Sequence, residues 1–111
     1  MKVMRWLLAL LSFKGSTKRF GDGSLIRFVN RDNFEYREAD GRAMDVEAYV
    51  TAEGPIDRII VRKCVERWSP PHEAEVVPAA KQEEILTKLR GYFDEVGTTY
   101  RIDPDLPADP H

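Results

Sequence analysis

One stretch of the chain, residues 78–97, carries the pattern of a single amphipathic helix. Pro78 suits the first turn of a helix, because that turn leaves its N–H groups unbonded, and Gly97 suits the position after the last turn. Between them runs one apolar stripe, formed by Ile85, Leu86, Leu89, Tyr92, Phe93 and Val96. A stripe of this kind must be buried against another element, so the residues before it have to supply an apolar surface.

The residues before the helix have the pattern of strands, and their clearest signal is a hairpin around Asp40-Gly41. A two-residue loop would mix apolar and charged side chains on one face. A three-residue loop, with Gly41 in the left-handed conformation, sets Tyr36 opposite Met44 and Phe34 opposite Val46. We predict this second register, because it gathers one apolar face: Phe34, Tyr36, Met44, Val46, Ala48 and Val50.

Further strands are expected on both sides of the hairpin. Residues 25–29 predict one, and residues 97–102 can form a last short one. Residues 58–68 are rich in β-branched side chains but alternate imperfectly, so either both faces are covered or a bulge near Arg62-Lys63 switches the phase. Residues 69–75 predict an extended loop, since two prolines remove donors. The sequence therefore predicts an α+β fold, an antiparallel sheet of about four to five strands packed by one C-terminal helix.

A chain of 111 residues has the size of one domain. We assign residues 24–103 to a single α+β domain and residues 104–111 to a disordered tail rich in proline and aspartate. Residues 1–23 form a basic and apolar arm or a short helix. The apolar run within it is too short to span a bilayer, which needs about 20 residues. It could pack on the domain, anchor at a membrane surface through residues 1–20, or extend away from the domain.

The charges are distributed unevenly along the chain. Residues 1–20 carry five of the 17 cations and no acid, so residues 21–111 hold 12 cations against all 19 acids, a net charge of −7. An acidic body argues against nucleic-acid binding, because affinity for phosphates comes from clustered lysine and arginine. It would suit a basic protein partner, although ordinary solubilising charge explains it as well.

The residue types that usually carry chemistry are scarce. Cys64 is the only cysteine, which excludes an intramolecular disulfide and a cysteine-based zinc site. Of the two histidines, His111 ends the chain, and His72 is the one candidate general base, close to Glu73 and Glu75. No Gly-rich phosphate loop or His-Glu-x-x-His motif occurs. We therefore predict no catalytic residue, no cofactor and no metal; a small enzyme or ligand carrier would need a pocket that converges on His72.

The segment from Trp68 to Glu75 is the best candidate for contact with a partner. A tryptophan beside a rigid proline pair offers a large anchor at low ordering cost. In the alternative interpretation the tryptophan belongs to the core and the prolines only direct the chain into the helix. The residues predicted to contact a partner are Trp68, Pro70, Pro71, His72, Glu73 and Glu75.

The order of these features resembles the immunity protein 74 family of bacterial polymorphic-toxin systems over residues 33–102. The shared features are a Phe-x-Tyr and Gly-Arg-x-Met hairpin, Trp68-x-Pro-Pro, an acidic and apolar bridge at residues 73–77, a helix with Ile-Leu-x-x-Leu-x-x-Tyr-Phe spacing, and a final strand. The resemblance implies a small α+β protein of the bacterial cytoplasm that binds and neutralises a cognate toxin. It carries over no catalytic residue, and Trp68 is the one position that it transfers.

Our leading hypothesis is therefore a non-enzymatic protein-binding module, an immunity protein whose partner is a basic toxin. The alternatives are a membrane-peripheral protein anchored by residues 1–20 and a small ligand-binding protein. We expect a cytoplasmic location, with membrane association in the first alternative. The oligomeric state is left open.

Overall fold

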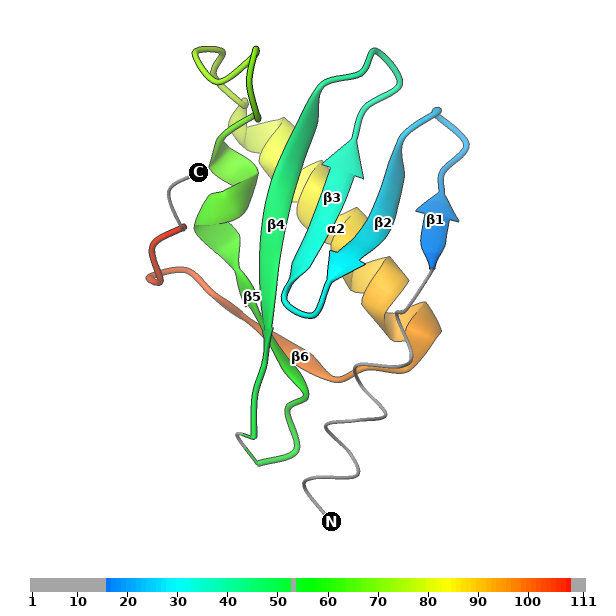
Figure 1. Cartoon of the computed structure of the whole chain (residues 1–111), viewed down its shortest axis with the longest axis vertical. Helices are drawn as coiled ribbons and strands as arrows, with labels where there is room; N and C mark the ends of the chain where they lie inside the picture. Colours follow the sequence, from blue (N-terminus) through cyan, green and yellow to red (C-terminus); the bar gives the residue numbers. More distant parts are fainter. Residues whose placement is uncertain (1–15, 53, 109–111) are drawn as a thin grey trace.

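The computed structural model describes residues 16–52 and 54–108. Within them six strands form one open sheet, with a single α-helix across one face (Figure 1). The strands follow the chain order across the sheet. Their bounds are β1 (Thr17–Arg19), β2 (Leu25–Asn30), β3 (Asn33–Arg37), β4 (Ala43–Val50), β5 (Arg58–Val61) and β6 (Tyr100–Asp103), and the helices are η1 (Arg62–Glu66) and α2 (Ala79–Val96).

The predicted α+β class and the C-terminal helix are confirmed, and the sheet has one strand more than the upper end of the prediction. It is also mixed rather than purely antiparallel, because β6 pairs with β5 in parallel. The reason is the path of the chain: η1 and α2 carry it back along the sheet, so β6 starts from the same end as β5. Helix α2 begins after Pro78 and ends at Gly97, which adopts the left-handed conformation with φ 85°.

The hairpin between β3 and β4 has the register predicted from the sequence. Phe34 lies opposite Val46 and Tyr36 opposite Met44. The backbone N–H of Glu38 donates to the carbonyl of Arg42 at 2.7 Å, and Gly41 has φ 97°. A side chain at this φ would be strained, so a glycine is what allows the three-residue loop.

Replacing Gly41 with alanine is expected to lower the free energy of unfolding by about 1–2 kcal/mol, because a residue with a Cβ is strained at this φ. Gly91 provides the matched control, since it lies within α2 and no atom other than its chain neighbours and the helix's own backbone approaches within 4 Å of the position that a Cβ would occupy there. Gly91→Ala should raise stability by about 0.5–1 kcal/mol through helix propensity. Urea unfolding followed by circular dichroism measures both; equal effects of the two substitutions would contradict the assigned turn.

Residues 58–68 fit the interpretation as a strand covered on both faces only as far as Val61, since β5 lies between β4 and β6 and the successive residues Ile60 and Val61 are both buried. Strand β5 stops at Val61, and the 3-10 helix η1 follows in place of a longer strand or a bulge. The buried side chains Val61, Cys64, Val65 and Trp68 are spaced three and four residues apart, which is a helical rather than a strand period. Helix η1 packs beside β4 where β5 has ended, and the Cys64 thiol accepts the backbone N–H of Glu47 at 3.5 Å.

The domain begins earlier than residue 24, where the sequence placed its boundary. Strand β1 pairs with β2, and the Lys18 ammonium binds the Glu95 carboxylate of α2 at 2.9 Å. At the other end, Leu106 is partly buried against the core, so the assigned tail is packed on the domain at that point. The predicted arm, short helix or membrane anchor falls mainly on residues 1–15, which lie outside the described residues, as do residues 109–111.

The core lies between α2 and the sheet. Phe34 packs against Phe93 and Tyr92 of α2, with ring centroids 5.2 and 6.0 Å apart. The fully buried guanidinium of Arg58 lies 5.2 Å from the Phe34 ring centroid and donates to the carbonyls of Arg31 and Ala48. Burial lowers the pKa of Arg58 to about 10, so this side chain remains a cation at neutral pH. In the described part of the chain, no helix combines the length and apolar character needed to cross a membrane.

Candidate functional site

Trp68 lies in the hydrophobic core, with only 5% of its surface exposed. It belongs to the same buried cluster as Val65 and Val77, on either side of the proline loop. Its predicted role as an exposed anchor is therefore not supported, and the alternative interpretation as a core residue describes its position. The side chains that a partner could reach come from the loop above it.

Residues 69–76 form a compact loop rather than the extended one that the prolines suggested. The N–H of His72 donates to the carbonyl of Ser69, and the N–H of Glu75 donates to the carbonyl of His72, each at 3.0 Å. The two ends of the loop are held, because Ser69 donates to the carbonyl of Ala43 at 2.7 Å and Val76 forms a β-bridge with Arg67. Pro70 and Pro71 are exposed on it.

Ionic contacts fasten this loop to the turn between β3 and β4. The Arg42 guanidinium donates to both carboxylate oxygens of Glu75, at 2.7 and 3.1 Å, and to the carboxylate of Asp40 at 2.6 Å. The Nδ1 atom of His72 lies 2.7 Å from Glu75. Two loops distant in sequence are thus joined through one arginine, and a bidentate arginine contact fixes geometry better than a lysine would.

These contacts favour the ionised forms of both carboxyl groups. The side-chain hydrogen bonds from Arg42 hold the pKa of Glu75 below its usual range. The pKa of Asp40 is lowered mainly by the backbone N–H of Arg42. Because each folded-state pKa lies below the unfolded value of about 4, each carboxylate adds stability above that pH and loses it as the pH falls through the folded value.

We expect Arg42→Met to raise the pKa of Glu75 toward its ordinary value, while the pKa of Asp40 keeps the part of its lowering that comes from the backbone N–H of residue 42. The stability difference between wild type and variant should shrink as the pH falls below about 4. Carbon-detected NMR titration of the carboxyl groups measures the first effect, and urea unfolding at several pH values the second. Arg37→Met, which removes an exposed partner of Glu35, serves as the control. An unchanged pKa of Glu75 in the Arg42 variant would contradict the contact.

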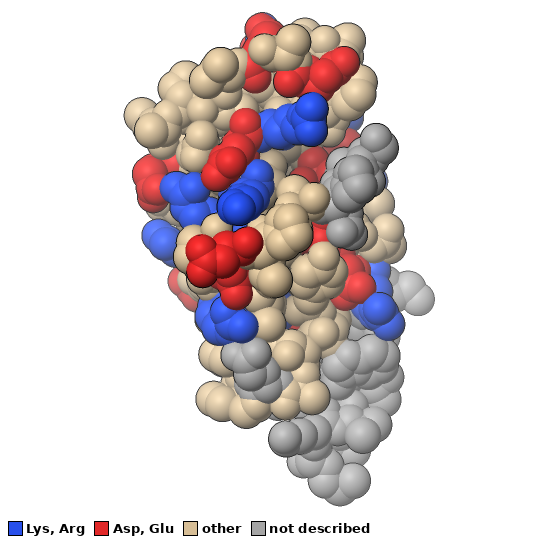
Figure 2. Space-filling model, turned by 90° about the vertical axis from the view of Figure 1, so that its left-hand side faces the viewer, with Lys and Arg blue, Asp and Glu red and all other residues tan. Residues whose placement is uncertain are grey.

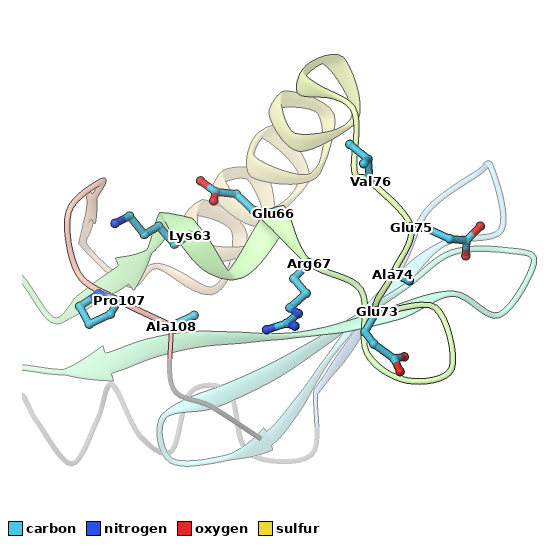
Figure 3. Close-up of a pocket in the computed structure, with 9 residues that line it drawn as sticks. All are labelled: Lys63, Glu66, Arg67, Glu73, Ala74, Glu75, Val76, Pro107 and Ala108. Atoms are coloured by element: carbon cyan, nitrogen blue, oxygen red, sulfur yellow. The ribbon is translucent and has the colours of Figure 1, made fainter.

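Beside the loop lies an open hollow of about 500 Å³ (Figure 3). Three segments line it: η1 with the residue after it, the second half of the loop, and the chain after β6. Val76, the most exposed large apolar side chain in the described residues, is 84% exposed in its wall. The lining residues are Lys63, Glu66, Arg67, Glu73, Ala74, Glu75, Val76, Pro107 and Ala108.

The predicted contact residues are therefore only partly brought together. Glu73 and Glu75 line the hollow, whereas His72 does not, so this hollow does not converge on the one candidate general base. Sequence reasoning missed Val76, Lys63 and Arg67. The pair Val76-Val77 before Pro78 offered a signal, since neighbouring side chains in extended chain point in opposite directions and only one of the two could enter the core.

A second group of polar contacts holds the turn between β1 and β2 against α2. The Lys88 ammonium binds the Asp22 carboxylate at 2.6 Å and the Ser24 hydroxyl at 2.8 Å. It also lies over the rings of Phe20 and Tyr36, 5.3 and 5.5 Å from their centroids. The hydrogen bond from Lys88 lowers the pKa of Asp22. Every group here has a partner within the protein, which is the arrangement of a structural tether.

No group of three or more His, Cys, Asp and Glu side chains in residues 16–52 and 54–108 is placed to hold a metal ion. No family model, curated protein or solved structure matches this chain. Any functional proposal therefore rests on the arrangement of the site and on the sequence features described above.

Proposed function

We propose that this protein is a non-enzymatic binding module that recognises a partner protein through residues 69–76 and the adjoining hollow. The observation that carries the proposal is the exposure of Val76 on a loop whose two ends are both held by backbone contacts. An apolar side chain exposed on the same loop as two exposed prolines is unfavourable in water and favourable in an interface.

The loop is also well prepared for binding. Its backbone turns, the Trp68 side chain in the core below it and the Arg42–Glu75 contact fix its shape before a partner arrives. A surface ordered in advance loses little conformational entropy on association, which increases affinity without added contact area.

The partner that we propose is a toxin, which the protein would neutralise by occupying its surface in the cytoplasm. The proposal draws on the resemblance of residues 33–102 to toxin-immunity proteins and on the net charge of −7 over residues 21–111. An acidic body attracts a basic partner over long range and speeds the encounter.

The toxin that we propose as partner is to be sought in the gene that adjoins the gene for this protein, and co-expression with the product of that neighbouring gene tests this role. A stable complex that elutes as one peak in gel filtration, together with survival of cells that make both proteins, is the expected result. Cells that make the neighbouring protein alone should stop growing. If the two proteins elute separately and this chain gives no protection, the immunity role is lost.

The apolar and basic N-terminal segment favours a second candidate, attachment to a membrane surface. A deletion that tests this candidate must leave β1 in place, because β1 belongs to the sheet. Deleting residues 2–14 should then abolish sedimentation with anionic vesicles. Equal sedimentation of the full and shortened chains would exclude this attachment.

A further inference from the structure

The charged side chains around the hollow differ in whether they already have a partner. Glu75 is held by Arg42 and His72, and Glu66 lies 3.6 Å from the Arg62 guanidinium. In contrast, Lys63, Arg67 and Glu73 make no ion pair within the described part of the chain. The charges that remain available here are therefore two cations and one acid.

The two cations and the apolar wall belong to one surface. In Figure 3 the Arg67 side chain extends between Glu73 and Ala108, while the Glu75 side chain points away from them. Lys63 lies on the side of Pro107, and Val76 closes the opposite end. Figure 2 shows that positive and negative side chains alternate over this side of the molecule, so no single charge covers it.

We propose that the hollow receives a segment of the partner protein that carries a carboxylate next to an apolar side chain. The carboxylate would bind the Arg67 guanidinium on the side that faces Lys63, whose more distant ammonium adds positive charge; both groups have unused donors. The apolar neighbour would cover Val76, Pro107 and Ala108. This inference rests on the proposed function, because it specifies the chemistry of the segment bound at the same surface.

Glu73 contributes specificity to this arrangement. Its carboxylate stands on the loop side of Arg67 and repels an acidic group that enters at that end. The incoming carboxylate is thereby restricted to the side of Lys63, which fixes the direction in which the segment lies.

An acidic segment is compatible with a partner of positive net charge. Residues 21–111 carry a net charge of −7 and the whole chain a net charge of −2, and this excess of acids acts at longer range than the contacts in the hollow, although salt screens it over about 10 Å. Contacts inside the hollow act at hydrogen-bond and van der Waals distance and depend on the side chains that line it, among which Lys63 and Arg67 supply the positive charge. A basic partner can therefore present one acidic and apolar segment here.

Selection from a random heptapeptide library against the immobilised full chain tests the inference. Peptides that bind should share an aspartate or glutamate beside a large apolar residue. A selected peptide should bind the variant Lys63→Glu/Arg67→Glu at least about 10-fold more weakly in fluorescence anisotropy, since each lost charge-assisted contact costs about tenfold in affinity. The control Arg19→Glu/Arg90→Glu changes the net charge equally at two exposed cations outside the hollow and should alter affinity less than about twofold.

Three results would overturn the inference: no enriched peptide, an enriched motif without an acidic residue, or equal weakening by the two double variants. Circular dichroism checks that both variants are folded. The outcome is separable from that of the proposed function. If acidic peptides bind the hollow but the neighbouring protein forms no complex, the binding site is supported and the toxin role is rejected. If the complex forms and Lys63→Glu/Arg67→Glu does not affect it, the toxin role is supported and the binding site is rejected.

Discussion

Trp68→Ala is expected to lower the free energy of unfolding by about 3–5 kcal/mol. The side chain is 5% exposed and belongs to the main core cluster, so its removal leaves a cavity beneath the proline loop. If Trp68 were instead a surface anchor, the same change would cost little stability and would act on binding alone. Urea unfolding followed by circular dichroism distinguishes the two, because the chain holds a second tryptophan that complicates fluorescence.

Val76→Ala provides the control for this experiment. Val76 is 84% exposed, so shortening it should change stability by less than about 0.5 kcal/mol. A loss at Val76 as large as the loss at Trp68 would mean that the two side chains have been assigned to the wrong sides of the loop.

Phe34→Ala should cost a similar amount, about 3–5 kcal/mol. Phe34 is fully buried at the centre of the contact between sheet and helix, where it touches Phe93, Tyr92 and the Arg58 guanidinium. The substitution removes the ring from these partners and from Phe28, whose ring centroid lies 5.7 Å away. It also leaves the Arg58 cation against a cavity, which adds to the loss.

Phe34→Leu separates volume from specific ring contacts. It keeps most of the buried volume and should cost less than about 1.5 kcal/mol. Thermal and urea unfolding of both variants measure the difference. A loss below about 1 kcal/mol for Phe34→Ala would contradict the packing of α2 on this strand.

The features that the sequence predicted well are those that depend on neighbouring residues. Pro78 and Gly97 mark the ends of α2, because each favours a backbone conformation found at one end of a helix. The hairpin register followed from Gly41 and from the requirement that Phe34 and Tyr36 face the same side as Met44 and Val46. Both arguments need no knowledge of distant parts of the chain.

The features that it predicted poorly depend on long-range contacts. The direction of β6 is decided by the path of α2 over the sheet, which a strand pattern does not contain. The segment from Arg58 to Trp68 contains four β-branched residues, three of them in a row at residues 59–61, and their strand propensity concealed the helical spacing that begins at Val61.

The candidate site illustrates the same division. The sequence singled out the proline loop, but the hollow also needs η1 and residues 107–108, which only the fold brings together. The charge balance of the sequence predicted a basic partner. Whether a given charged side chain is already paired or is available to a partner depends on its neighbours in space. Arg42 neutralises Glu75 across 33 positions of sequence, while Arg67 is left available.

Isothermal titration of the neighbouring gene product into the full chain tests the central claim, that residues 69–76 and the hollow form the partner-binding surface. Val76→Asp places a charge on the exposed wall of the hollow. Val29→Asp places the same charge in strand β2, on a side chain that is 43% exposed and is the second large apolar one exposed among the described residues. We predict that Val76→Asp raises the dissociation constant at least about 10-fold and that Val29→Asp changes it less than about twofold. Unchanged affinity for Val76→Asp, or a larger loss for Val29→Asp, would contradict the account.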